Sequence, residues 1–219
     1  MKQLSKREST YRTLSRWFGA VYATIGIVTG IYNIFASTPY YVMLAFASIL
    51  FLFLPALFYK LLRLEPIYAL NFAVYLFCFI AFMIGMVFNA YHLIPYYDKF
   101  AHTLSGVFFG LLGIVFYYLL KPRKQIEKAD CGAAAFSAVT FALSTAVIWE
   151  IIEYALSYLL GNDCQNVLTT GVNDTMQDMI VCLIGALVFL IPLLLYYLKG
   201  RKGLLMGIFE EFFNRNLKK

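Results

Sequence analysis

The sequence predicts an all-α membrane protein, a bundle of six transmembrane helices with both termini in the cytoplasm. Of the 219 residues, 62% are hydrophobic and only 14% are charged, whereas a soluble domain is about half apolar and a quarter charged. Six apolar runs reach the roughly 20 residues that a helix needs to cross the hydrocarbon core. The composition excludes a sizeable soluble domain. In such a protein, the net charge of +6 indicates the orientation in the membrane and does not indicate a nucleic-acid partner.

Each apolar run predicts one helix, because short charged or proline-containing turns separate the runs. The predicted spans cover residues 17–36, 41–60, 67–91, 98–120, 132–160 and 174–198. Together they form one transmembrane domain over residues 1–202. The run 17–36 follows a basic segment, as in a signal peptide, but it is longer than the usual apolar core of such a peptide. We therefore expect an uncleaved first helix.

The basic residues predict the orientation of the bundle. Every Lys and Arg except Lys99 falls in the amino-terminal segment, in the loops after the second and fourth spans, or in the carboxyl-terminal tail. The positive-inside rule assigns these segments to the cytoplasm. The loops near residues 37–40, 92–97 and 161–173 then lie outside.

The tail, residues 203–219, predicts an amphipathic helix. Its apolar residues share one helical face: Leu204, Leu205, Ile208, Phe209, Phe212 and Phe213. Its polar residues share the other: Glu210, Glu211, Asn214 and Arg215. This pattern is typical of a helix that lies on a membrane surface, here the inner leaflet.

Three pairs of ionisable residues stand in the last three spans, whereas the interiors of the first three contain none. The pairs are Asp98 with His102, Glu150 with Glu153, and Asp174 with Asp178. Residues three or four apart share a helical face, so each pair points in one direction. Acids inside a membrane span are costly and are kept mainly where they have a function.

The predicted topology brings the three pairs to similar depths. At about 1.5 Å per residue, His102 and Asp178 lie roughly 6 Å below the outer ends of their helices. Glu153 and Glu150 lie roughly 10 and 15 Å below the outer end of the fifth helix by the same rise. All three pairs therefore belong to the outer half of the membrane.

Small residues lie on the same helical faces as His102 and Asp178, and they predict the direction in which these faces point. Gly106 and Gly110 follow His102 at four-residue intervals, and Cys182 and Ala186 follow Asp178 in the same way. Small residues at this spacing let neighbouring helices approach closely. Both faces should point into the bundle.

The grouped carboxyl groups predict a cation or bound protons among them. Five carboxylates cannot all stay ionised in a small, poorly hydrated space. No Lys or Arg lies deep in a span, and Lys99 is one position away from the Asp98 face. That leaves a metal ion, protons or a cationic ligand. Carboxylates with one histidine suit a divalent ion such as Mg²⁺, Mn²⁺, Fe²⁺ or Zn²⁺.

These residues lead to a first functional hypothesis, an intramembrane enzyme with a divalent metal ion that acts on a lipid or envelope precursor. The expected ligands are Asp98, His102, Glu150 and Asp178. The metal would activate water or polarise a phosphoryl or carbonyl oxygen. Glu153 would act as the general base, and Asp174 would support the ligands without touching the ion.

Simpler explanations stay open. Asp98 and Asp174 each begin a helix, where Asp is a common N-cap, and His102 alone would fit a hydrogen bond between packed helices. Glu150, Glu153 and Asp178 would also fit a protonated structural cluster. Alternatively, the acids would relay protons or bind a cation in a transporter or channel.

Three motifs stand in the second half of the chain: Tyr97-Asp98-Lys-Phe-Ala-His102-Thr-Leu-Ser-Gly106, Trp149-Glu150-Ile-Ile-Glu153-Tyr154, and Asp174-Thr-Met-Gln-Asp178-Met179 with Gly185-Ala186. With these motifs the chain resembles the YjdF-type (DUF2238) bacterial inner-membrane proteins. The first motif is also more loosely similar to VanZ-like membrane proteins. The resemblance implies a multi-pass protein of the bacterial cytoplasmic membrane, and it implies no particular reaction.

Overall fold

The computed structural model describes residues 4–161 and 163–218. Lys2 and Lys219, expected in the cytoplasm, and Asn162, expected in an outer loop, lie outside the described residues. The part of the chain that is described is helical and contains no strand. Six of its helices are long and apolar enough to cross a membrane, which confirms the predicted all-α class with six candidate spans.

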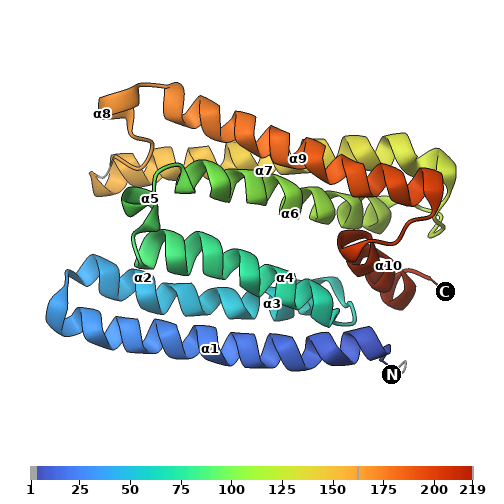
Figure 1. Ribbon diagram of the computed structural model, residues 1–219, viewed down its shortest axis with the longest axis horizontal. Helices are drawn as coiled ribbons and strands as arrows, with labels where there is room; N and C mark the ends of the chain where they lie inside the picture. The colour runs from blue at the N-terminus through green and yellow to red at the C-terminus, as the bar shows by residue number, and fades with distance from the viewer. Residues whose placement is uncertain (1–3, 162, 219) are drawn as a thin grey trace. The chain divides into compact units, whose positions relative to one another are not determined.

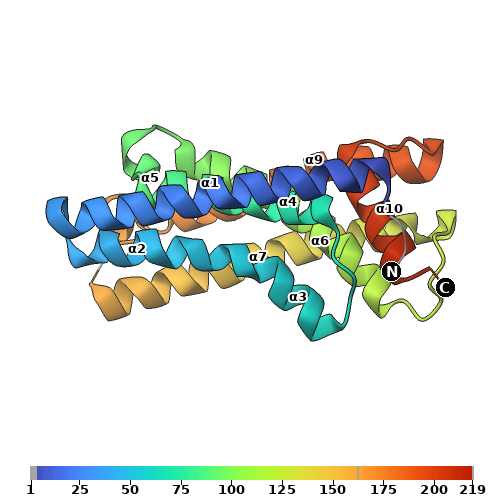
Figure 2. The same cartoon turned by 90° about the horizontal axis from the view of Figure 1, so that it is seen from below.

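The helices follow one another with short connections (Figure 1). Their bounds are α1 Lys6–Ala36, α2 Pro39–Leu50, η1 Phe51–Phe53, α3 Leu54–Leu62, α4 Tyr68–Cys78, η2 Phe79–Val87, α5 Ala90–Leu93, α6 Tyr97–Leu120, η3 Lys128–Asp130, α7 Cys131–Leu160, α8 Val167–Thr170, α9 Asn173–Lys199 and α10 Leu204–Asn216. The second span combines α2, η1 and α3, and it bends where Pro55 stands in the first turn of α3 (Figure 2). The third span combines α4 with the π-helical segment η2.

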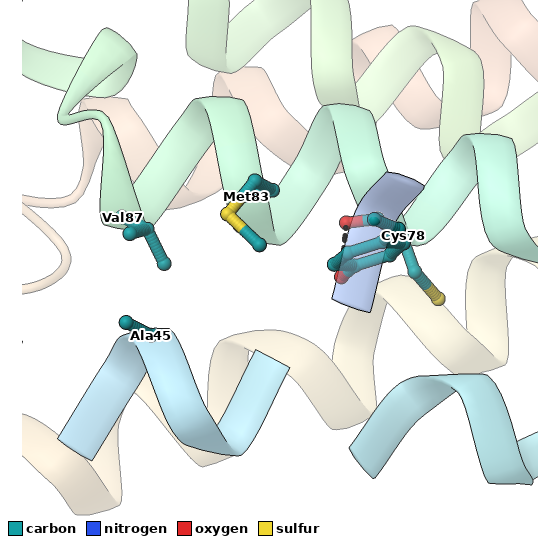
Figure 3. Close-up of a cluster of buried hydrophobic side chains, with 5 residues drawn as sticks. Ala45, Cys78, Met83 and Val87 are labelled. Atoms are coloured by element: carbon teal, nitrogen blue, oxygen red, sulfur yellow. Dashed lines mark hydrogen bonds between the residues drawn. The ribbon is translucent and has the colours of Figure 1, made fainter. Parts of the chain in front are cut away.

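The chain divides into two compact units, one up to Tyr97 and one from Asp98 on. In the first unit, α1, α2 and α4 lie side by side (Figure 1). Ala45 of α2 faces Met83 and Val87 of the third span in a fully apolar contact (Figure 3). The hydroxyl of Tyr22 in α1 donates a 3.4 Å hydrogen bond to the carbonyl of Cys78, which ties α1 to the same core.

The first helix starts well before the predicted residue 17. The hydroxyl of Ser5 accepts a 3.2 Å hydrogen bond from the backbone N–H of Glu8 and so caps α1. The buried carboxylate of Glu8 in turn accepts bonds from the backbone N–H groups of Tyr68 (2.6 Å) and Ala69 (3.2 Å). Those two groups open α4 and would otherwise lack partners. Glu8 therefore caps α4 although it is far from it in the sequence. The residues next to the start of α4 do not indicate this cap.

The third span ends earlier than predicted. Its helix stops at Val87 rather than near residue 91, because Asn89 adopts a left-handed conformation with φ of 60°. Asparagine tolerates this region better than most residues. The residues beyond it form the separate short helix α5.

The second unit contains α6, α7 and α9 side by side (Figure 1). The hydroxyl of Ser137 in α7 donates a 2.9 Å hydrogen bond to the carbonyl of Gly113 in α6. A Cβ atom at Gly113 would stand 2.7 Å from the carbonyl oxygen of Ser137, so only glycine permits this approach. The close contact fixes α6 against α7.

The tail forms the predicted amphipathic helix, α10, but part of its apolar face contacts protein. The ring of Phe209 lies 5.2 Å from that of Tyr118 and 6.1 Å from that of Tyr196, and Phe213 lies 5.4 Å from Tyr118. These aromatic residues bind α10 to the ends of α6 and α9. Leu204 is 61% exposed, so the apolar face of α10 is open at its first residue.

Candidate functional site

The first pair of site residues lies near the start of α6. Asp98 and His102 are one turn apart, and the Nε2 atom of His102 is 3.5 Å from Oδ1 of Asp98. His102 is only 8% exposed, whereas the Asp98 side chain is 30% exposed. The predicted shared face is therefore present, with its histidine end buried.

The second pair lies near the start of α9 and meets the first. Asp178 is 2% exposed, and its Oδ1 atom is 3.9 Å from Nε2 of His102. One ligand atom from each of Asp98, His102 and Asp178 lies within 4.8 Å of the others. The structure therefore brings three of the four predicted metal ligands together.

Two glycines bring these helices into contact. A Cβ atom at Gly106 of α6 would overlap the carbonyl oxygen of Cys182 and approach the backbone nitrogen of Ala186 to 2.8 Å. A Cβ atom at Gly185 of α9 would overlap the carbonyl oxygen of Thr103. The backbones of α6 and α9 touch one turn beyond His102 and Asp178, as the spacing of small residues predicts.

Lys99 corrects the expectation that no basic side chain serves the acids. Its ammonium group donates to Asp174 Oδ1 at 2.6 Å, Asp178 Oδ1 at 2.8 Å and Asp98 Oδ2 at 3.2 Å. Its backbone position is one residue off the Asp98 face, but a four-carbon stem carries the charge around the helix to α9. The ammonium group of Lys99 is therefore a cation within the acidic cluster.

Asp174 is not a helix cap in the structure. Val172 occupies the N-cap position of α9, and no side chain caps it. The two oxygens of Asp174 bond instead to Lys99 and to the side-chain amide of Asn166, the latter at 2.7 Å. This leaves Asp174 joined to Asp98 and Asp178 through the shared ammonium group of Lys99.

The third pair lies on α7, and its two acids have different surroundings. Glu150 is 6% exposed; its Oε2 atom accepts a 3.1 Å hydrogen bond from Gln165, and its buried Oε1 atom has no hydrogen-bond partner. Glu153 is partly buried and accepts a 2.8 Å bond from the indole N–H of Trp149. Glu150 lies outside the group of ligand atoms that Asp98, His102 and Asp178 form, and Gln165 joins it to Thr175 of α9. The third pair is therefore linked to the start of α9 by a side chain of the connecting segment.

Three further residues hold the acids, and sequence reasoning missed two of them. Gln165 donates to the carbonyl and the carboxylate of Glu150 and to the hydroxyl of Thr175. Asn166 holds Asp174. Both lie in the polar segment between α7 and α9 that was predicted only as an outer loop. Trp149, by contrast, stands one turn before Glu153, a spacing at which a side-chain bond is expected.

The ligand atoms are grouped more loosely than around a bound divalent ion. Nitrogen and oxygen ligands lie about 2.0–2.2 Å from such an ion and therefore about 3–3.5 Å from one another. The His102 separations are 3.5 Å, at the upper end of that range, and 3.9 Å, beyond it. Lys99 binds Oδ2 of Asp98 and leaves the Oδ1 atom beside His102, but it also binds Oδ1 of Asp178, the atom nearest His102. An ion would therefore bind Asp178 through its other oxygen or share Oδ1 with Lys99. The residue types are those of a hard or borderline divalent site.

One comparison with known proteins identifies a family of membrane proteins. Comparison with curated proteins and with solved structures gives no match. A family model described as "Predicted membrane protein (DUF2238)" matches residues 14–199. The match contains all six candidate spans in whole or in large part and every site residue, and it ends before α10. The chain belongs to this DUF2238 family of predicted membrane proteins.

Proposed function

We propose that the second unit holds a divalent metal ion between α6, α7 and α9, and that the protein is a metal-dependent membrane enzyme. Asp98, His102 and Asp178 would supply three ligands, and Glu150 the fourth. The unpartnered Oε1 atom of Glu150 is the observation that carries this proposal. A buried acceptor without a donor is rare and costly, and a bound cation would satisfy it.

The balance of charge supports a second cation beside Lys99. Five carboxyl groups stand on the three helices of the proposed site, namely Asp98, Glu150, Glu153, Asp174 and Asp178. Lys99 forms ion pairs with three of them, all aspartates. Among the described residues, no ion pair joins Glu150 or Glu153 to a basic side chain. A divalent ion beside Glu150 would offset two further negative charges.

The remaining residues would prepare the reaction. A bound ion supplies Lewis acidity and lowers the pKa of coordinated water. Trp149 fixes one oxygen of Glu153, and the other oxygen would take a proton from the attacking water. Lys99 and Asn166 hold Asp174 in place, which keeps the neighbouring Asp178 oriented.

The surroundings of the site favour a lipid or envelope precursor as substrate. The site residues belong to three candidate membrane spans. The distribution of Lys and Arg favours cytoplasmic termini, and with that orientation the starts of α6 and α9 would lie at the outer face of a bacterial cytoplasmic membrane. A substrate with a phosphoryl or carbonyl group at that depth would reach the metal from the lipid phase.

One observation favours a second candidate function, proton- or cation-coupled transport. Lys99 already joins Asp98, Asp174 and Asp178 in one network of charged hydrogen bonds. Chains of ionisable groups inside a membrane are typical of proton relays. Proton flux into proteoliposomes that is abolished by Asp178→Asn, in protein that binds no metal, would favour this function over the enzyme.

Replacing Glu150 by glutamine tests the fourth ligand. We expect the affinity for Mn²⁺ or Zn²⁺, measured by titration of the purified protein, to fall at least about tenfold, because a neutral amide replaces an anionic ligand. Glu153→Gln is the matched control on the same helix, and it should leave the affinity within a fewfold of wild type. Equal losses in the two variants would contradict the assigned roles.

A further inference from the structure

A second candidate binding site lies where α9 ends and α10 begins. A cavity of about 410 Å³ is lined there by Pro192 and Leu195 of α9 and by Arg201, Lys202 and Gly203 of the connecting segment. One wall is apolar and the rim is basic. None of these residues takes part in the metal centre.

The backbone holds the basic rim against the apolar wall. Gly200 has a φ of 66°, a left-handed conformation that ends α9 and turns the chain back. The backbone N–H of Arg201 then donates a 3.2 Å hydrogen bond to the carbonyl of Leu195. Arg201 is therefore fixed beside Leu195 by the turn itself, before any ligand binds.

The charges at the rim are not balanced within the protein. Lys202 forms a 2.7 Å ion pair with Glu210 of α10, and both side chains are partly open to solvent. Arg201 and Lys199 are exposed, and neither guanidinium nor ammonium group has a side-chain partner among the described residues. The rim therefore keeps a net positive charge that an anionic ligand would neutralise.

The position of the cavity along α9 favours a phospholipid over a free phosphate ion as the anionic ligand. Leu195 stands one turn before the end of a candidate membrane span that ends at Lys199. At about 1.5 Å per residue, it lies roughly 6 Å inside that end. The apolar wall is thus at the depth of acyl chains and the basic rim at the depth of phosphate headgroups. A free phosphate ion would use the rim but not the wall.

We propose that this cavity binds an anionic phospholipid, with its phosphate on Arg201 and Lys202 and the first carbons of an acyl chain on Pro192 and Leu195. Lys199 adds to the local positive potential. The orientation that the basic residues favour puts the site at the inner leaflet, where anionic lipids attract basic segments next to a span. The site is independent of the metal centre and of the proposed enzyme activity.

Native mass spectrometry of the purified full chain tests this assignment. The protein is equilibrated in detergent with equal amounts of phosphatidylglycerol and phosphatidylcholine, and the retained lipids are counted. Wild type should retain phosphatidylglycerol at least about fivefold over phosphatidylcholine, the effect of one basic residue at a membrane surface. Arg201→Ala should remove this preference, and Arg201→Lys should keep most of it.

Two controls make the result decisive. Arg123→Ala removes the same charge from an exposed position outside the cavity and should keep the preference. Leu195→Trp fills the cavity but keeps every charge, and it should release the lipid. Equal retention of the two lipids by wild type, or equal loss in Arg201→Ala and Arg123→Ala, overturns the proposal. So does full displacement of the lipid by millimolar inorganic phosphate, because the site would then bind the ion alone.

Discussion

Replacing Lys99 by methionine is expected to lower the free energy of unfolding by about 3–5 kcal/mol, the cost of leaving buried charges without a partner. The Lys99 side chain is 19% exposed, and its partners Asp174 and Asp178 are 13% and 3% exposed. Because Asp174 and Asp178 are largely shielded from solvent, water replaces the lost ammonium group poorly. Chemical unfolding of the protein in detergent micelles measures the change.

Lys202→Met is the matched control for this experiment. Lys202 forms one close ion pair, 2.7 Å from Glu210, whereas Lys99 forms three, and the Lys202 side chain is 61% exposed. An exposed pair of this kind contributes only about 0–1 kcal/mol. Losses of similar size in the two variants would contradict the description of Lys99 as the internal cation of the cluster.

Replacing Gly106 by alanine should both destabilise the protein and weaken metal binding. The added methyl group would overlap the backbone of α9 at Cys182, and a backbone cannot move aside as a side chain can. We expect a loss of about 3 kcal/mol, at the upper end of the usual range for overpacking. Because α6 and α9 must separate, the 3.9 Å approach of His102 to Asp178 would lengthen. Unfolding and metal titration on the same sample measure both effects.

Gly132→Ala makes the same chemical change where the structure leaves room. A Cβ atom at Gly132, in the first turn of α7, would meet nothing within 4 Å. The substitution should be neutral, or stabilising by up to about 1 kcal/mol, because alanine favours the helix. If Gly106→Ala behaves in the same way, α6 and α9 do not touch at that point.

The sequence predicted the parts of this structure that depend on helical period. Length and hydropathy identify the six spans, since a helix that crosses a membrane must be long and apolar. The four-residue spacing of His102 and Gly106 identified the face of α6 that packs on α9. Both results follow from the geometry of a single helix, which neighbouring residues determine.

The parts that were missed depend on contacts between segments far apart in the chain. The reach of Lys99 to α9 depends on a flexible side chain and on how closely the two helices approach. Gln165 reaches Glu150 only because the segment after α7 folds back onto it. Glu8 caps α4 from about 60 residues away. Helical spacing contains no information on such contacts.

Metal content, measured by inductively coupled plasma mass spectrometry on protein purified from membranes, tests the central claim most directly. We predict a stoichiometric divalent ion in wild type and its loss in His102→Ala. His92, the other histidine of the chain and an exposed one, supplies the matched control, and His92→Ala should keep the ion. Wild-type protein without stoichiometric metal, or equal metal in wild type and His102→Ala, would contradict a metal centre formed by Asp98, His102 and Asp178.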